Sequence, residues 1–312
     1  MTRAVGRAAH AIDYARLAEA QRSRAERSLS LLRTSYLHGG ALTSVGVLPS
    51  GVIVRQDGPH RRIGRGGVRG SITGFSPDSQ RRLKRRLVAL DFSRHHWQFI
   101  TLTYPGEYSY QPRTWKNNLR ALRAALERHW GDVFRGAIWR LEQQRRGAPH
   151  YHLLVCWAKP IPTRPIRRWV RETWTRVVGD TLTNATWVRT EVQDVRVTVD
   201  GGVPALMGYL CKYLGKTSHR GWLDPTTGEL LPIGRCWGEW GEIPYASPTW
   251  YLLGPAELAQ LVRRLRRLRP RSNYFATMTV DRFQGVFWGT AEWWTGSLRG
   301  LSWASHPLAD TG

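Results

Sequence analysis

Residues 137–157, AIWRLEQQRRGAPHYHLLVCW, consist of two apolar stretches separated by a short polar segment. AIWRLEQQ at 137–144 and HYHLLVCW at 150–157 have the length and the aliphatic and aromatic content of buried strands. The intervening RRGAP carries the glycine and proline that are typical of a turn. The stretch therefore predicts an antiparallel hairpin, and the predicted elements on either side determine the fold around it.

The neighbouring segments alternate between strand and helix patterns. WQFITLTYP at 97–105 predicts a strand that ends at its proline, and strands are again favoured at 186–197. Helical periodicity covers 114–130, 164–178 and, after the last strand, 204–216. The order β-α-β-β-α-β is that of a ferredoxin-like (RRM-like) α+β fold, an antiparallel sheet with helices on one face.

The segments outside this pattern are strongly basic. We expect arginine-rich helices as flanks, a loop or loose β-hairpin in the glycine-rich 39–75, and a short strand-like tail with Trp288, Trp293 and Trp294. The flanking helices are predicted at 13–37, 78–90 and 255–271. The predicted regions are a basic N-terminal extension, a catalytic domain and a basic, Trp-rich C-terminal region, at 1–92, 93–220 and 221–312.

Charge indicates the class of partner. The 312 residues carry 47 Lys and Arg against 23 Asp and Glu, a net charge of +24, which favours a polyanion such as nucleic acid. Only five of the basic residues are Lys, so an arginine-rich coding bias explains part of this pattern. Three widely spaced cysteines exclude a disulfide scaffold and suit the cytoplasm. Apolar runs such as Leu153–Ala158 are too short to span a membrane.

Two histidines and a carboxylate are the candidate metal ligands. His150 and His152 alternate on one strand, so both rings project from the same face and can share a divalent cation. The predicted turn folds Glu142 back beside them, and a mixed nitrogen and oxygen set suits Mg²⁺ or Mn²⁺. The alternatives are two ordinary sheet histidines, and a Glu142 that only pairs with one of its arginine neighbours. Those neighbours are Arg140, Arg145 and Arg146.

The predicted helix at 204–216 contains the candidate nucleophiles. Tyr209, Tyr213 and Lys216 share one flank, with Lys212 close by. Adjacent ammonium groups would favour the phenolate form of a tyrosine, which is a poor nucleophile at its usual pKa of about 10. The alternative is an aromatic stripe that packs in the core together with leucines of the same helix.

Together these motifs resemble the HUH endonuclease superfamily, in particular the rolling-circle replication initiators of bacterial plasmids and single-stranded-DNA phages. The resemblance covers residues 97–241. FITLTYP at 99–105 looks like the first motif of that family, and PHYHLLV at 149–155 is similar to its metal motif. Residues 209–216 resemble the tyrosine motif, and RCWGEWG at 235–241 is similar to a run that follows it.

The resemblance implies a metal-dependent nickase and strand transferase that acts on single-stranded DNA at a replication origin. His150, His152 and Glu142 would hold Mg²⁺ or Mn²⁺. Tyr209 or Tyr213, or both in alternation, would attack the phosphorus and leave a 5′-phosphotyrosine and a free 3′-OH. Lys212 would offset the developing charge, and Lys216, Arg145 and Arg146 would contact DNA. Host helicase and polymerase are the further partners expected.

Two other readings stay open. Another HUH enzyme, a transposase or a relaxase, would use similar chemistry; relaxases have a three-histidine metal set, for which His95 and His96 are available. A protein of another class would be a non-catalytic, basic single-stranded nucleic-acid-binding protein. The intact candidate ligands and tyrosines argue against the second reading.

Overall fold

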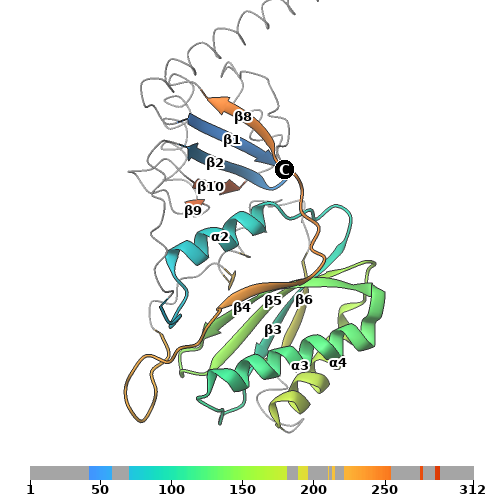
Figure 1. Ribbon diagram of the computed structural model, residues 1–312. Coiled ribbons are helices and arrows are strands. Elements are labelled where there is room, and N and C mark those ends of the chain that lie inside the picture. Colours follow the sequence, from blue (N-terminus) through green and yellow to red (C-terminus); the bar gives the residue numbers. More distant parts are fainter. Residues whose placement is uncertain are drawn as a thin grey trace, which may run out of the picture.

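The computed structural model describes residues 42–57, 70–180, 189–195, 210, 213–214, 221–253, 275–276 and 285–288. These residues form two five-stranded sheets, and all strand pairs in them are antiparallel. The protein is therefore of the α+β class, as predicted (Figure 1).

The first sheet contains the predicted ferredoxin-like core. Its strand order is β6-β3-β5-β4-β7, in which the first four strands have the arrangement of a β-α-β-β-α-β unit. The strands are β3 (His96–Thr103), β4 (Phe134–Gln143), β5 (Pro149–Trp157), β6 (Glu191–Asp194) and β7 (Trp237–Gly241). β6 is shorter than the predicted strand at 186–197, of which residues 186–188 and 196–197 lie outside the described part of the chain.

Helices α3 (Pro112–Trp130) and α4 (Thr163–Val178) cover one face of this sheet (Figure 1). Each presents an apolar stripe at helical spacing, which is why both fold onto the sheet. The buried members of these stripes are Leu119, Leu122 and Leu126 in α3, and Ile166, Val170 and Trp174 in α4. A short 3-10 turn, η1 (Gly131–Val133), connects α3 to β4.

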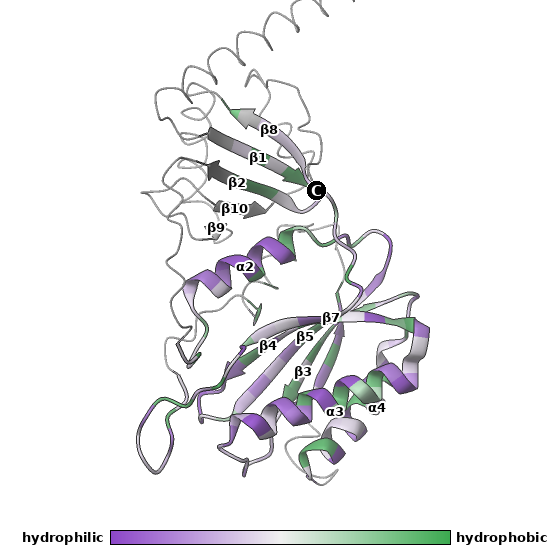
Figure 2. Ribbon diagram, viewed as in Figure 1, coloured by the Kyte–Doolittle hydropathy of each residue, from purple (hydrophilic) through white to green (hydrophobic). Residues whose placement is uncertain are grey.

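The opposite face of the sheet is partly covered by α2 (Pro77–Val88), the predicted basic helix. Most of this helix is hydrophilic, as Figure 2 shows, but Leu83 and Leu87 are fully buried. Ser76 caps its N-terminus by accepting a hydrogen bond from the backbone N–H of Ser79 at 3.2 Å. Because one side of α2 is apolar and the other is arginine-rich, the helix joins the core and keeps its charges at the surface.

Strand β7 was missed from the sequence, where residues 234–241 read only as an aromatic stretch. It pairs with β4, and glycines allow the close approach. A Cβ atom at Gly136 would lie 2.3 Å from the carbonyl oxygen of Trp240, and one at Gly238 would lie 2.9 Å from the Trp139 ring. Pairing between segments a hundred residues apart leaves no local periodicity to detect.

The second sheet corrects the expectation that the flanks are basic and helical. Its order is β8-β1-β2-β10-β9, so N-terminal and C-terminal segments pair with each other. The strands are β1 (Leu42–Leu48), β2 (Gly51–Asp57), β8 (Thr249–Leu253), β9 (Phe275–Ala276) and β10 (Gly285–Trp288). β1 and β2 form the hairpin that was one of two expectations for this region, because alternating valines such as Val45 and Val54 bury one face.

Other predicted flanking elements lie outside the described residues: the helices at 13–37 and 255–271, and Trp293 and Trp294. The boundaries at 92 and 220 stay a prediction, although β1–β8 and β4–β7 pairing crosses them. Leu48 and Ile53 of the β1–β2 hairpin join the same hydrophobic cluster as α2. Among the described helices, none combines the length and apolar character needed to cross a membrane.

Candidate functional site

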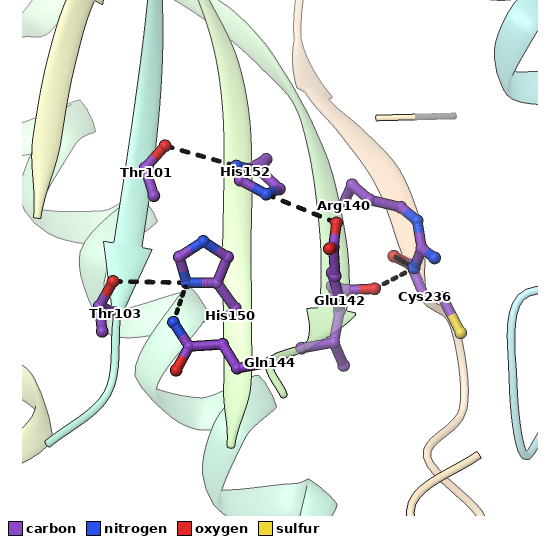
Figure 3. Close-up of polar contacts among 9 residues, drawn as sticks. Thr101, Thr103, Arg140, Glu142, Gln144, His150, His152 and Cys236 are labelled. Carbon is purple, nitrogen blue, oxygen red and sulfur yellow. Dashed lines mark hydrogen bonds and ion pairs between the residues drawn. The ribbon is translucent and has the colours of Figure 1, made fainter. Parts of the chain in front are cut away.

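The register of the first sheet brings the predicted ligands together on one face (Figure 3). His150 lies directly opposite Glu142 on β4 and opposite Thr103 on β3. Residues directly opposite each other in antiparallel strands point to the same side of the sheet. The His150 and His152 rings are 4.6 Å apart between centroids, at an angle of 89°. The face is the one not covered by α3 and α4.

Threonines of β3 contact both rings. The Thr101 hydroxyl lies 3.4 Å from Nδ1 of His152, and the Thr103 hydroxyl lies 3.4 Å from Nδ1 of His150. The side-chain amide of Gln144 is 3.1 Å from the same atom of His150. A hydroxyl that accepts a hydrogen bond from Nδ1–H leaves Nε2 with its lone pair, the state that a metal ligand needs. These threonines and Gln144 were missed from the sequence, because β3 and β5 are not consecutive strands.

Burial keeps the His150 ring neutral. Loss of solvation, followed by the influence of the neighbouring His152 ring, lowers the pKa of His150 to about 3. His152 is only 4% exposed. A neutral imidazole is the form that coordinates a metal, so the chemistry of the donors fits a divalent cation.

The Glu142 carboxylate completes this donor set. One of its oxygens is 3.5 Å from Nε2 of His152. Two ligands at about 2.1 Å from one cation and about 110° apart would be separated by about 3.4 Å, so this pair is spaced as for a shared cation. Within the described residues, however, no three or more His, Cys, Asp or Glu side chains are grouped closely enough to form a complete metal cluster. His150 would therefore have to move towards this pair.

Arg140 lies beside Glu142 and is almost fully buried, at 1% exposure. Its guanidinium donates hydrogen bonds to the carbonyls of Leu141 and, at 3.3 Å, Cys236, and it lies 3.7 Å from the centroid of the Phe75 ring. Burial lowers the pKa of Arg140 to about 10, while the Glu142 carboxylate acts in the opposite direction. The side chain joins β4 to the segment before β7, and its burial gave no signal in the sequence.

Tyr213 lies next to the histidines. Its ring centroid is 5.5 Å from that of His152 and 5.7 Å from that of Phe99. Leu210 and Leu214 of the same helical segment are fully buried, as a packed stripe requires. The other predicted residues of this segment lie outside the described part of the chain: Tyr209, Lys212 and Lys216.

The two arginines of the β4–β5 turn differ in their contacts. The Arg146 guanidinium donates to the carbonyls of Tyr104 at 2.6 Å and Gly106 at 3.0 Å, and to the Gln144 side chain at 3.0 Å. It thereby ties the turn to the loop after β3. Arg145 is exposed to solvent at the tip of the turn.

The histidines before β3 lie at the other end of the sheet. His96 is opposite Trp157, five residues from Thr101 along β3, which corresponds to about 17 Å. Its Nε2 is 3.5 Å from the Asp194 carboxylate. His96 is therefore far from the His150–His152 pair, and the three-histidine arrangement of a relaxase is not formed by it.

The comparison with protein families agrees with this geometry. Residues 97–218 match the model of a family described as replication-associated protein ORF2. These residues are a Rep-like domain. The Rep-like domain runs from β3 to the helical segment of Tyr213, so it contains the histidine pair, Glu142 and Tyr213. No curated protein and no solved structure gave a significant match to the chain. The matched segment identifies a replication-associated protein; α2 and strands β7 to β10 lie outside it.

Proposed function

We propose that this protein is a rolling-circle replication initiator that nicks and rejoins single-stranded DNA through a 5′-phosphotyrosine. One observation carries the proposal: the Tyr213 ring lies 5.5 Å from His152, on the sheet face where Glu142 and His150 also project. A tyrosine beside two histidines and a carboxylate supplies both a nucleophile and a phosphate-activating site. Their common position within the Rep-like domain supports the same conclusion.

The proposed step is an in-line displacement at phosphorus. A bond forms between the tyrosine Oη and phosphorus while the bond from phosphorus to the 3′ oxygen breaks. The phenol loses its proton and the departing 3′ oxygen gains one, which leaves a free 3′-OH for a polymerase. A later 3′-OH can attack the phosphotyrosine and restore the phosphodiester, because the transferred bond is retained in the protein–DNA link.

The histidines and Glu142 would hold Mg²⁺ or Mn²⁺. When bound, the cation would polarise the scissile phosphate. The chain's own contribution is to orient the ligands: Thr101 and Thr103 contact the Nδ1 atoms, and burial keeps His150 neutral.

The remaining roles follow from the tyrosine motif. Tyr213 is the proposed first nucleophile because of its place beside His152. Tyr209 would be a second nucleophile one helical turn away, which allows the two to alternate between rounds. Lys212 would offset the charge that develops on the phosphate, with Lys216 and Arg145 contacting the DNA backbone.

The decisive experiment is covalent capture. The full-length protein is incubated with random-sequence, single-stranded oligonucleotides and Mn²⁺, and DNA that stays attached in denaturing detergent is recovered and sequenced. We expect an adduct whose DNA begins with a defined sequence at its 5′ end, which would also identify the origin. Tight binding with no covalent adduct would instead identify the non-catalytic binding protein.

A further inference from the structure

A basic groove runs along α2, outside the residues that match the Rep family. A cavity of about 900 Å³ lies between α2 and β7. Arg82 and Arg86, one helical turn apart, line it from the helix, and Trp237 lines it from the strand. Arg235 and Phe75 complete the part of the wall that carries charge or an aromatic ring.

The groove continues past these residues. A second cavity of about 450 Å³ is lined by Arg82, Arg86 and Trp237 as well, and extends to Tyr245 and Trp250. The two cavities therefore adjoin along the same arginines. We call this surface the α2 groove, defined by Arg82, Arg86, Arg235, Trp237, Tyr245 and Trp250.

The α2 groove combines charge and aromatic faces. The Arg86 side chain is 55% exposed and its guanidinium lies 4.9 Å from the Tyr245 ring centroid, with Glu239 at 3.3 Å. Arg82 is exposed and bonds to the Ser79 hydroxyl at 3.2 Å. The two arginines are about 6 Å apart along the helix axis, comparable to the spacing of successive phosphates in an extended strand. Guanidinium groups interleaved with aromatic rings are the arrangement that binds single-stranded nucleic acid.

The α2 groove is also close to the histidine pair. Trp237 lies directly opposite Arg140, and Arg140 lies directly opposite His152, so the three residues form one row across three neighbouring strands. Two strand spacings separate the backbones of Trp237 and His152 by about 10 Å. α2 lies on this same face of the sheet (Figure 1). A DNA strand leaving the histidines therefore reaches the groove within a few nucleotides.

We propose that the α2 groove binds the backbone of the single-stranded DNA that extends from the scissile phosphate. This inference rests on the proposed function for the identity of the ligand. Arg82 and Arg86 contact consecutive phosphates, and Trp237 offers a stacking surface for a base. The groove would thus hold the strand in place while the Rep-like domain acts on it.

The test compares two double variants of equal charge. Arg82→Gln with Arg86→Gln removes the groove's helical arginines; Arg113→Gln with Arg120→Gln removes two exposed arginines of α3, on the opposite face of the sheet. Binding of a single-stranded oligonucleotide of about 30 nucleotides, long enough to pass beyond the histidines, is measured by fluorescence anisotropy between low and high NaCl. Circular dichroism melts confirm that each variant is folded.

Loss of two phosphate contacts should reduce the slope of log affinity against log salt by about 1.4, at about 0.7 for each contact. We expect this change for the groove variant only, and a charge-conserving variant with Lys at both positions should regain the slope. An unchanged slope in the groove variant, or an equal change in the α3 variant, would overturn the inference.

A second measurement uses the unmodified protein. Photo-crosslinking with halogenated bases should attach DNA to the peptide that contains Trp237 or to the one that contains Tyr245. Crosslinks confined to α3 and α4 would contradict the proposed path. Covalent adduct formation by the wild-type protein is scored separately: wild-type protein that binds through the groove but forms no adduct would refute the proposed function and not the groove.

Discussion

The Tyr213 ring packs against the His152 ring, with 5.5 Å between centroids and 63° between planes. Phe99 lies against both rings, 5.4 Å from His152 and 5.7 Å from Tyr213. The tyrosine is therefore held beside the candidate metal ligands by apolar contacts that do not involve its hydroxyl.

This packing allows a direct test of the nucleophile. Tyr213→Phe retains the ring and removes only the oxygen, so we expect stability to change by less than about 1 kcal/mol while adduct formation falls sharply. Denaturing gels of protein incubated with labelled single-stranded DNA measure the adduct. Tyr110→Phe, at an exposed tyrosine, is the matched control and should behave as wild type.

The double variant Tyr209→Phe with Tyr213→Phe separates one-tyrosine from two-tyrosine chemistry. It should form no adduct, and a single variant that keeps part of the adduct would indicate alternation. Full adduct formation by the double variant would refute the tyrosine mechanism.

Metal affinity should depend on Glu142. Glu142→Gln keeps the size of the side chain but removes the negative charge, so Mn²⁺ affinity measured by calorimetry should fall at least about tenfold. Glu127→Gln, on the exposed side of α3, removes the same charge and should leave the affinity unchanged. Chelation of metal should also abolish adduct formation by the wild type. Equal affinities in the two variants would exclude Glu142 as a ligand.

The neighbouring arginines of the β4–β5 turn should separate stability from DNA binding. Arg146→Ala removes hydrogen bonds to the carbonyls of Tyr104 and Gly106, so we expect a loss of about 1 kcal/mol in the free energy of unfolding. Arg145→Ala should leave stability unchanged and weaken binding of single-stranded DNA. Urea denaturation and anisotropy measure the two effects, and equal stability losses would contradict the assignment.

Lys116 should destabilise the fold near neutral pH. Its ammonium donates to the carbonyl of Arg235 and lies 4.9 Å from the Trp139 ring centroid, and burial lowers its pKa from 10.5 to about 8. Between these values the unfolded state binds more protons than the folded state, so wild-type stability should rise with pH across this window.

Lys116→Met removes this titration. At pH 7 the variant should be about 1–3 kcal/mol more stable than wild type, and the advantage should shrink by about pH 10. Urea denaturation at several pH values measures the difference. A variant that is less stable at every pH would show that the contact with Arg235 outweighs the cost of burying the charge.

Much of the Rep-like domain could be predicted from local patterns. The stretch 137–157 folds as the expected hairpin, and α2, α3, α4 and β3 lie close to their predicted ranges. Helical and strand periodicity depends on burial of one side of each element, and that signal is present in consecutive residues. β7 and the sheet of β1, β2, β8, β9 and β10 were not predicted, because strands far apart in sequence gain their partners only in the folded chain.

The candidate site divides along the same line. The sequence alone determined that His150 and His152 share a face and that a turn returns Glu142 to them, because alternation and a short hairpin fix these relationships locally. Only the tertiary structure decided that Tyr213 packs on His152, that Thr101 and Thr103 contact the rings, and that α2 and Trp237 form a groove nearby. Those contacts join separate segments, and their geometry depends on how the whole core packs, which no local pattern specifies.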